Sequence, residues 1–195
     1  EILSRFTWKG NEFNVRTVCH PAQDMISAHI DSHLHTGIKF HFPYPTGIHT
    51  DNACDWDAND KHSTEVLKQD TQSAVLKRTL DSTVYYVELK WEGKALLKEK
   101  EKNYFVLLPQ EDAFSFSCAF TANEPDQLAV LPDFFEVESL AKNHWVNFWE
   151  EGAAVDFSHC TDLRAKELER RVVLSQYLLA IQCAGSTPPQ ETGLT

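Results

Sequence analysis

The sequence of 195 residues lacks an apolar run of the roughly eighteen to twenty residues that a membrane-spanning helix needs, so we expect no membrane partner. It also lacks a block of lysine and arginine. The densest charged stretch, Lys98 to Lys102, alternates in sign, and the net charge is -11. Because binding to phosphates needs concentrated positive charge, we expect no nucleic-acid partner.

The five cysteines are scattered, odd in number and without a C-x-x-C pair. We interpret them mostly as buried small apolar residues and not as a disulfide framework. Cys160 and Cys183 are not expected to be nucleophiles, because the only histidine adjacent to either, His159, is a chain neighbour whose side chain would not face Cys160. The cysteines do not decide the cellular location of the protein, and we prefer a periplasmic or secreted location to a cytoplasmic one.

From Phe6 to about Thr121 the dominant signal is β. Runs of β-branched and aromatic residues between turn residues predict strands at 14–19, 25–30, 37–42, 73–80, 84–91, 104–108 and 113–120. Many short strands in succession favour an antiparallel sandwich. The segment 44–62 is polar and poor in strand signals, and loops of that length are usually functional or disordered.

The hydrophobic period changes to that of a helix at Pro132. The apolar face of this predicted helix consists of Val137, Leu140, Ala141, His144, Trp145, Phe148 and Trp149. Asp133 is the expected cap and Gly152 the expected stop. We interpret the aromatic residues on this face as core and not as a sugar-stacking platform.

A second amphipathic helix is predicted from about Leu163, with Thr161 or Asp162 as its cap. Its apolar face consists of Leu168, Val172, Tyr177, Leu178, Leu179 and Ile181. This face is larger than a mostly β domain usually needs to cover, so we interpret it as the first helix of a further helical domain. On this interpretation the chain is a fragment of a longer protein.

Two stretches carry side chains of the kind that bind metals. One stretch has alternate residues that would project from the same face of a strand: His29, Asp31, His33 and His35. Alternate side chains on a strand lie about 7 Å apart, which is too far for several of them to bind one metal ion. We therefore interpret this face as a polar outer face. Asp51, Asp55, Asp57 and Asp60 do not have the spacing of a calcium loop. We therefore expect no metal site and no cofactor.

Trp56 lies among these aspartates. An exposed loop tryptophan offers a flat apolar face to a pyranose ring. The alternative is a tryptophan that anchors its own loop against the sandwich.

The order of the predicted elements and several short sequence motifs resemble a known group of enzymes. The motifs are Trp145-x-x-Phe-Trp149, Ala154-Val-Asp-Phe157, Glu167 to Leu178, and Pro188-Pro-Gln-Glu-Thr-Gly-Leu-Thr195. They resemble the domain junction of bacterial glycoside hydrolases built as a β-supersandwich, similar to galactose mutarotase, followed by an (α/α)6 toroid. The chain is similar to glycoside hydrolase family 65 and to uncharacterised hydrolases related to it.

The resemblance implies three parts: a supersandwich at 1–131, a linker helix at 132–152, and the start of a truncated helical catalytic domain at 153–195. It implies that Gln190, Glu191, Thr192 and Thr195 border a sugar pocket, while the catalytic carboxylates lie outside the chain. The intact enzyme would then hydrolyse a glycosidic bond by acid–base chemistry with inversion. Its partners would be a carbohydrate substrate and the missing helical domain.

Two alternatives stay open. One is a glycoside phosphorylase of the same architecture. The other is a non-catalytic β-sandwich that binds carbohydrate or mediates assembly, with a homo-oligomer as a further possibility.

Overall fold

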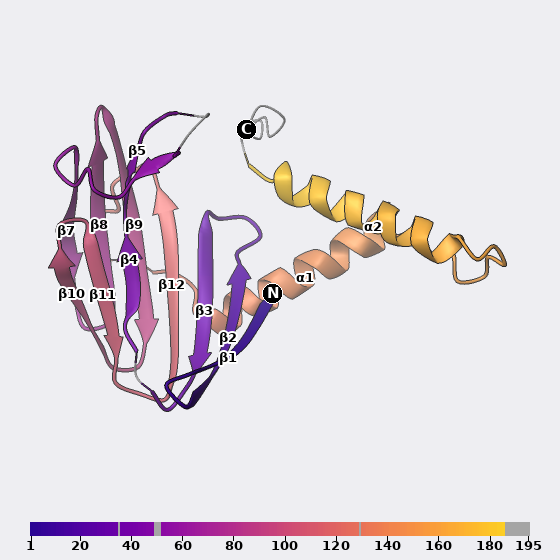
Figure 1. Cartoon of the computed structure of the whole chain (residues 1–195), viewed down its shortest axis with the longest axis horizontal. Coiled ribbons are helices and arrows are strands. Elements are labelled where there is room, and N and C mark those ends of the chain that lie inside the picture. The colour runs from indigo at the N-terminus through magenta and orange to yellow at the C-terminus, as the bar shows by residue number, and fades with distance from the viewer. Residues whose placement is uncertain (35, 49–51, 129, 186–195) are drawn as a thin grey trace. The chain divides into compact units, whose positions relative to one another are not determined.

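The computed structural model describes residues 1–34, 36–48, 52–128 and 130–185 (Figure 1). The chain forms two compact units, Glu1–Lys142 and Asn143–Thr195. The division between them falls within helix α1 (Phe134–Phe148). Each unit is described separately below.

The first unit is built from antiparallel strands. They are β1 (Ile2–Trp8), β2 (Asn11–Cys19), β3 (Met25–Asp31), β4 (Ile38–His41), β5 (Tyr44–Pro45), β6 (Cys54–Asp55), β7 (His62–Gln69), β8 (Ser73–Leu80), β9 (Thr83–Glu92), β10 (Ala95–Glu101), β11 (Tyr104–Pro109) and β12 (Ala113–Thr121). A seven-stranded sheet has the order β1-β2-β3-β12-β9-β8-β7, a three-stranded sheet has the order β10-β11-β4, and β5 pairs with β6. The prediction of a mainly β sandwich followed by helix is confirmed.

The core of the sandwich lies between the three-stranded sheet and strands β8, β9 and β12. Val87, Leu89 and Trp91 alternate along β9 and point to this core, where Phe105 and Leu107 of β11 meet them. All five side chains are at most 2% exposed. Fully burying an apolar side chain of this size contributes about 1.5–3 kcal/mol. This interface therefore fixes the two sheets against each other.

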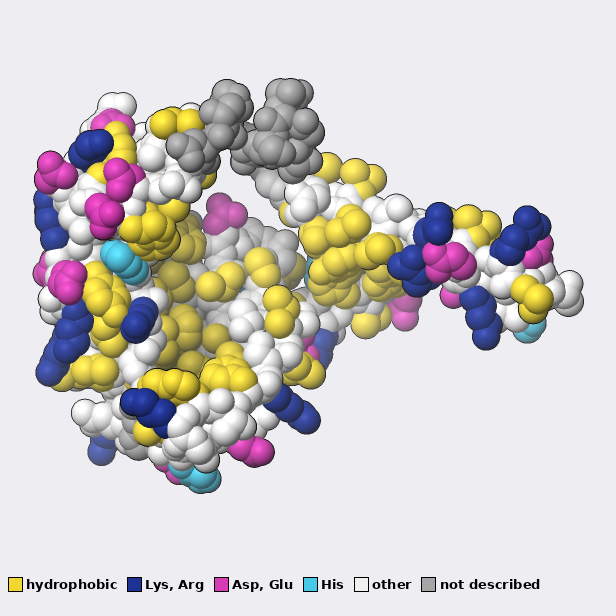
Figure 2. Space-filling view, viewed as in Figure 1, with side chains coloured by type: hydrophobic (Ala, Val, Ile, Leu, Met, Phe, Trp, Pro, Cys, Tyr) yellow, Lys and Arg dark blue, Asp and Glu magenta, His cyan; other side chains and the backbone are white. Residues whose placement is uncertain are grey.

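The three-stranded sheet faces only part of the larger sheet. Phe40 of β4 contacts Phe116 of β12 edge to face, with 5.8 Å between ring centroids. Beyond β12, the same face of the large sheet retains exposed apolar side chains, among them Phe6 of β1 and Ile26 of β3. Figure 2 shows apolar side chains around a hollow on this side of the molecule.

Helix α1 begins with a capping box. The Asp133 carboxylate accepts a hydrogen bond from the Glu136 amide at 2.9 Å, and the Glu136 carboxylate accepts one from the Asp133 amide at 3.0 Å. This confirms Asp133 as the cap. The first part of the helix packs on the other face of the seven-stranded sheet, where Phe134 and Val137 are fully buried with Met25.

The second unit contains the end of α1, a π-helical turn η1 (Trp149–Ala153) and α2 (Ala165–Gln182). Gly152 adopts a φ of 117°, which stops the helix as predicted. The N-cap of α2 is Arg164, which makes no side-chain cap hydrogen bond, so the prediction of Thr161 or Asp162 as the cap is wrong. The Asp162 carboxylate instead accepts a hydrogen bond from the Arg164 amide at 2.9 Å, in the turn before the helix. No helix within the described residues has the length and apolar character to cross a membrane.

The aromatic residues of α1 are less buried than predicted. Trp145 contacts Tyr177 of α2 at 5.1 Å between ring centroids, and Phe148 contacts Trp149 at 4.8 Å. Trp145, Phe148 and Trp149 are only half-buried. On α2, Leu168 is 53% and Leu179 is 66% exposed, so its apolar face is largely open.

Five strands of the described residues were not predicted: β1, β5, β6, β7 and β10. β7 and β10 are edge strands with charged outward positions, which hide the alternation of apolar residues. The polar segment 44–62 contains the short β5–β6 pair as well as the start of β7.

The cysteines are free, but the prediction that most are buried is wrong. Only Cys118 is buried, whereas Cys19, Cys160 and Cys183 are exposed and Cys54 is intermediate. Burial raises the pKa of the Cys118 thiol to about 12.

We expect the exposed thiols to react with a disulfide reagent such as Ellman's reagent within minutes at pH 8, and Cys118 to react only after unfolding. Mass spectrometry of the labelled sites checks this, and rapid labelling of Cys118 in the native protein would contradict it.

Replacing Phe134 by alanine should lower the free energy of unfolding by about 3–5 kcal/mol, because the side chain is completely buried between α1 and the sheet. Phe135→Ala is the matched control, because Phe135 is 52% exposed and should lose less than about 1 kcal/mol. Urea unfolding measures both. Equal losses in the two variants would show that α1 does not pack in this way.

Candidate functional site

Trp56 follows the short hairpin β5–β6 and is 50% exposed. Its ring lies beside the His41 imidazole, with 4.8 Å between centroids, and His41 in turn contacts Tyr104 at 5.0 Å. The three rings come from a loop, from β4 and from β11. They form a continuous aromatic surface, which we call the Trp56 platform.

A hollow of about 510 Å³ adjoins the platform. Its lining is polar as well as apolar, and consists of Thr46, Ile48, Asn52, Ala53, Cys54, Asp55, Trp56 and Asp57. An aromatic face next to amide, hydroxyl and carboxylate groups combines the features that binding sites for small polar ligands share. The arrangement can therefore offer stacking and hydrogen bonds to the same ligand.

The hairpin that presents Trp56 is held by local hydrogen bonds. The Thr46 amide donates to the Ala53 carbonyl at 3.1 Å, and the Thr46 hydroxyl donates to the Asn52 carbonyl at 2.8 Å. The Asp55 carboxylate accepts a hydrogen bond from the Asp57 amide at 3.0 Å, which forms an Asx turn around Trp56. Trp56 is thus fixed in place without being buried. The ring contact with His41 is what the anchor interpretation predicts, and the 50% exposure is what the platform interpretation predicts.

Strand β8 carries a buried arginine close to its C-terminal end. Arg78 of β8 is 1% exposed, and its Nη1 donates to His62 Nδ1 and to Thr64 Oγ1, both at 2.8 Å. Its guanidinium lies 4.8 Å from the Phe42 ring centroid, and Nε donates to the Tyr85 hydroxyl at 3.3 Å. No carboxylate within the described ranges forms an ion pair with Arg78, so neutral partners surround this charge.

Asn103 completes this network. It lies in the β10–β11 turn with a φ of 63°, is fully buried, and accepts a hydrogen bond from Thr64 Oγ1 at 2.9 Å. Its amide group donates to the Asn59 carbonyl at 3.3 Å, which ties the network to the loop between β6 and β7. Arg78, His62, Thr64 and Asn103 were not predicted from the sequence. The available signal was the parity of Ala74, Leu76 and Arg78, which places the arginine on the inner face.

Tyr44 links the hairpin to the same region. Its hydroxyl donates to the Asp81 carboxylate at 3.0 Å, and this hydrogen bond is the main reason that the Tyr44 pKa is raised. Its ring lies 5.9 Å from the His62 ring and 5.3 Å from the Lys61 ammonium.

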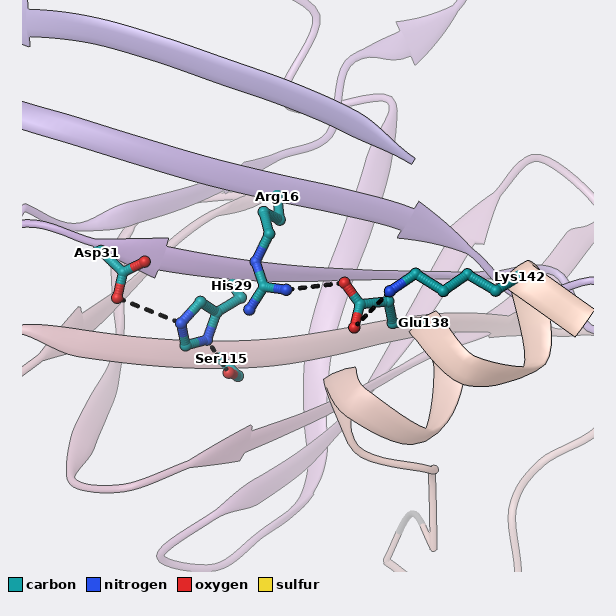
Figure 3. A network of polar contacts seen from close by, with 6 residues as sticks. All are labelled: Arg16, His29, Asp31, Ser115, Glu138 and Lys142. Carbon is teal, nitrogen blue, oxygen red and sulfur yellow. Dashed lines mark hydrogen bonds and ion pairs between the residues drawn. The ribbon is translucent and has the colours of Figure 1, made fainter.

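The His29–His35 run does not form a metal site among the described residues, and His35 lies outside them. His29 bonds to Ser115 Oγ at 2.7 Å and contacts the Asp31 carboxylate at 3.3 Å, as Figure 3 shows. His33 lies beyond the end of β3 and pairs with Asp112 at 2.7 Å. His29 and His33 therefore have separate partners.

His29 is also less exposed than the predicted polar outer face implies. It lies 5.4 Å from the Phe134 ring, under α1. Next to it, Arg16 bonds to Glu138 of α1 at 2.8 Å, and Lys142 contacts the same carboxylate at 3.3 Å (Figure 3). This polar cluster fastens the helix to the sheet and has a structural role.

Asp55 and Asp57 both line the hollow beside Trp56, but the remaining sequence candidates form no metal site in the described part of the chain. Asp55, Asp57 and Asp60 take part in no metal-binding group of described residues, and Asp51 lies outside these residues. Gln190, Glu191, Thr192 and Thr195 also lie outside them. Cys160 and Cys183 are exposed and free.

No protein-family model matches the chain, and a search of curated proteins finds no match.

The His62–Arg78 contact predicts a pH dependence of stability. Burial, followed by the charge of Arg78, lowers the His62 pKa below its usual 6.5; Lys102 and His41 act in the same direction and Asp60 opposes them. As the pH falls below about 6.5 the unfolded chain takes up a proton before the folded chain does. The free energy of unfolding should therefore decrease from pH 7 towards pH 5, and level off below the pKa of the folded state.

Urea unfolding across this pH range measures the effect. His62→Gln keeps an acceptor for Arg78 but does not titrate, so it should flatten the pH profile. His159→Gln, at an exposed histidine, is the matched control and should keep the wild-type profile. An unchanged slope in His62→Gln would assign the titration to another group.

Proposed function

We propose that this chain is the β-sandwich portion of a glycoside hydrolase, and that it contacts a sugar through the Trp56 platform. The observation that carries the proposal is the half-exposed Trp56 ring, fixed beside His41 at the edge of a polar hollow. A pyranose can stack its apolar C–H face on such a ring, while its hydroxyl groups bond to neighbouring polar side chains.

The layout of the chain supports the enzyme class. A mainly β sandwich precedes two successive helices, as in the hydrolases that the junction sequence resembles. The apolar face of α2 suits the proposed toroid, in which further helices would cover it. The proposal places the catalytic acid and base outside this chain and assigns hydrolysis with inversion to the intact enzyme, or phosphorolysis if phosphate replaces water.

A second candidate is a carbohydrate-binding module without catalysis. It is favoured by one observation: the platform and its hollow consist of residues from the first unit alone. Such a module would bind sugar without help from any other domain.

The first test is sugar binding by the 195-residue chain. Saturation-transfer NMR with a panel of glucose disaccharides that differ in linkage should give a signal, and Trp56→Ala should weaken binding at least about tenfold, equivalent to 1.4 kcal/mol. Trp8→Ala is the matched control, because Trp8 is 46% exposed in the same unit but lies on β1. Equal binding by Trp56→Ala and wild type would reject the platform.

The second test separates the two candidates. The product of the complete reading frame is assayed for release of reducing sugar, with and without phosphate. If reducing sugar is released and Trp56→Ala lowers the rate of release, the result supports the hydrolase. If the release depends on added phosphate, the result supports the phosphorylase. Binding without release favours the module, and absence of both rejects every form of the proposal.

A further inference from the structure

The four free edges of the two larger sheets are β1 and β7 in one sheet and β10 and β4 in the other. A free edge presents unpaired backbone N–H and C=O groups, which invite pairing with another strand. Proteins usually protect such edges with charges, bulges, proline or a very short strand.

Three of these edges carry such protection. β7 contains Glu65, and its register against β8 shifts between Val66 and Lys68. β10 carries the alternating charges of Lys98 to Glu101, and its register shifts between Glu99 and Glu101. β4 has four residues and is followed by Pro43. Pairing with another chain is discouraged at each of them.

β1 has no bulge, no proline and no short length, and it carries a single charge. Its seven residues pair with β2 without a shift, from Ile2 opposite Thr17 to Trp8 opposite Asn11. Arg5 is the only charge within the strand, whereas Ile2 is 67%, Leu3 is 64% and Phe6 is 51% exposed. A straight, apolar and exposed edge of this length is the kind that pairs with another strand.

One face of β1 continues the inner face of the sandwich. Val15 of β2 lies opposite Ile30 of β3, which lies opposite the core residue Phe114. Phe13 has the parity of Val15, and Phe6 lies opposite it with the two rings stacked at 5.0 Å. Ile2 and Trp8 share the parity of Phe6, so this face of the edge is apolar throughout except for Ser4.

We propose that β1 is a dimerisation edge that pairs, antiparallel and about a two-fold axis, with β1 of a second copy of the chain. The pairing joins two seven-stranded sheets into one continuous sheet. This inference does not depend on the proposed sugar-binding function.

The β1 sequence is self-complementary in one register. With Ser4 opposite Ser4 of the second copy, Ile2 lies opposite Phe6 on the apolar face, and Leu3 lies opposite Arg5 on the other face. Apolar cross-strand pairs contribute roughly 0.2–1 kcal/mol each. In this register no charge lies directly opposite a like charge.

The neighbouring registers are worse. A register centred on Arg5 would put two arginines directly opposite each other, which is destabilising. A shift by one residue would join the apolar face of one copy to the other face of its partner. A register centred on Leu3 would put Ile2 opposite Ser4, so that an apolar side chain would lie opposite a polar one. The edge therefore selects a second copy in the Ser4-centred register.

The test uses charges at Ser4, which is exposed and lies on the proposed axis. Sedimentation equilibrium of the wild-type chain should give twice the chain mass of 22.3 kDa at micromolar concentration. Ser4→Lys and Ser4→Asp each place two like charges opposite one another, so each should raise the dimer dissociation constant at least about tenfold. An equimolar mixture of the two variants should recover the dimer, because lysine then lies opposite aspartate.

Ser82→Lys is the matched control, because Ser82 is exposed in the turn between β8 and β9 and should leave the dimer unchanged. Circular dichroism verifies that each variant is folded. Three results would each overturn the proposal. They are a wild-type chain that stays monomeric up to about 100 µM, a Ser4→Lys dimer as tight as that of the wild type, and a mixture of the two variants that stays monomeric. If the variants do not fold, amide exchange decides: protection of β1 in the wild type must rise with protein concentration.

Discussion

The apolar contact between the three-stranded sheet and strands β8, β9 and β12 is the interaction on which the rest of the first unit depends. It buries Trp91 and Phe105, which are among the largest of the fully buried side chains. Helix α1 covers the opposite face at β2, β3 and β12. β12 is therefore covered on both faces, which explains why Ser115 and Ser117 are buried and bonded to His29 and Ser27.

The apolar contact ends at Arg78, where the core becomes polar. Burying a charge is costly unless hydrogen bonds satisfy it, and here His62, Thr64 and Tyr85 do so. The same network reaches Asn103 and the loop before β7. In consequence the loop that carries Trp56 is joined to this buried network through Asn59.

The sequence predicted the strands whose apolar residues alternate clearly and Asp133 as the cap of α1, but not the reciprocal hydrogen bond to Glu136. It did not predict β7 or β10, because charged residues in these edge strands interrupt the alternation of apolar and polar side chains. The strand predicted at 25–30 ends one residue short of β3. The parity of His29 and Asp31 is real, but it does not apply to His33, because the strand ends at Asp31 and His33 pairs with Asp112.

The candidate site shows a similar division. Trp56 could be recognised as a candidate because a tryptophan in a polar loop is unusual, but its partners His41 and Tyr104 are separated from it in sequence and meet it only through the pairing of β4 with β11. Arg78 was hidden for the opposite reason. Its position in an apolar strand indicates burial, yet nothing local shows which neutral groups would accept its hydrogen bonds.

The two proposed surfaces lie on different parts of the sandwich and can be studied separately. Trp56 rests on His41 of β4, and β4 packs over β12 through Phe40 and Phe116. In the large sheet, β3 and β2 lie between β12 and β1. A charge at Ser4 therefore changes the edge without touching the platform. Because distant sites contribute almost additively, a loss of sugar binding in a Ser4 variant would mean that the platform needs the dimer, and retained binding that each copy binds independently.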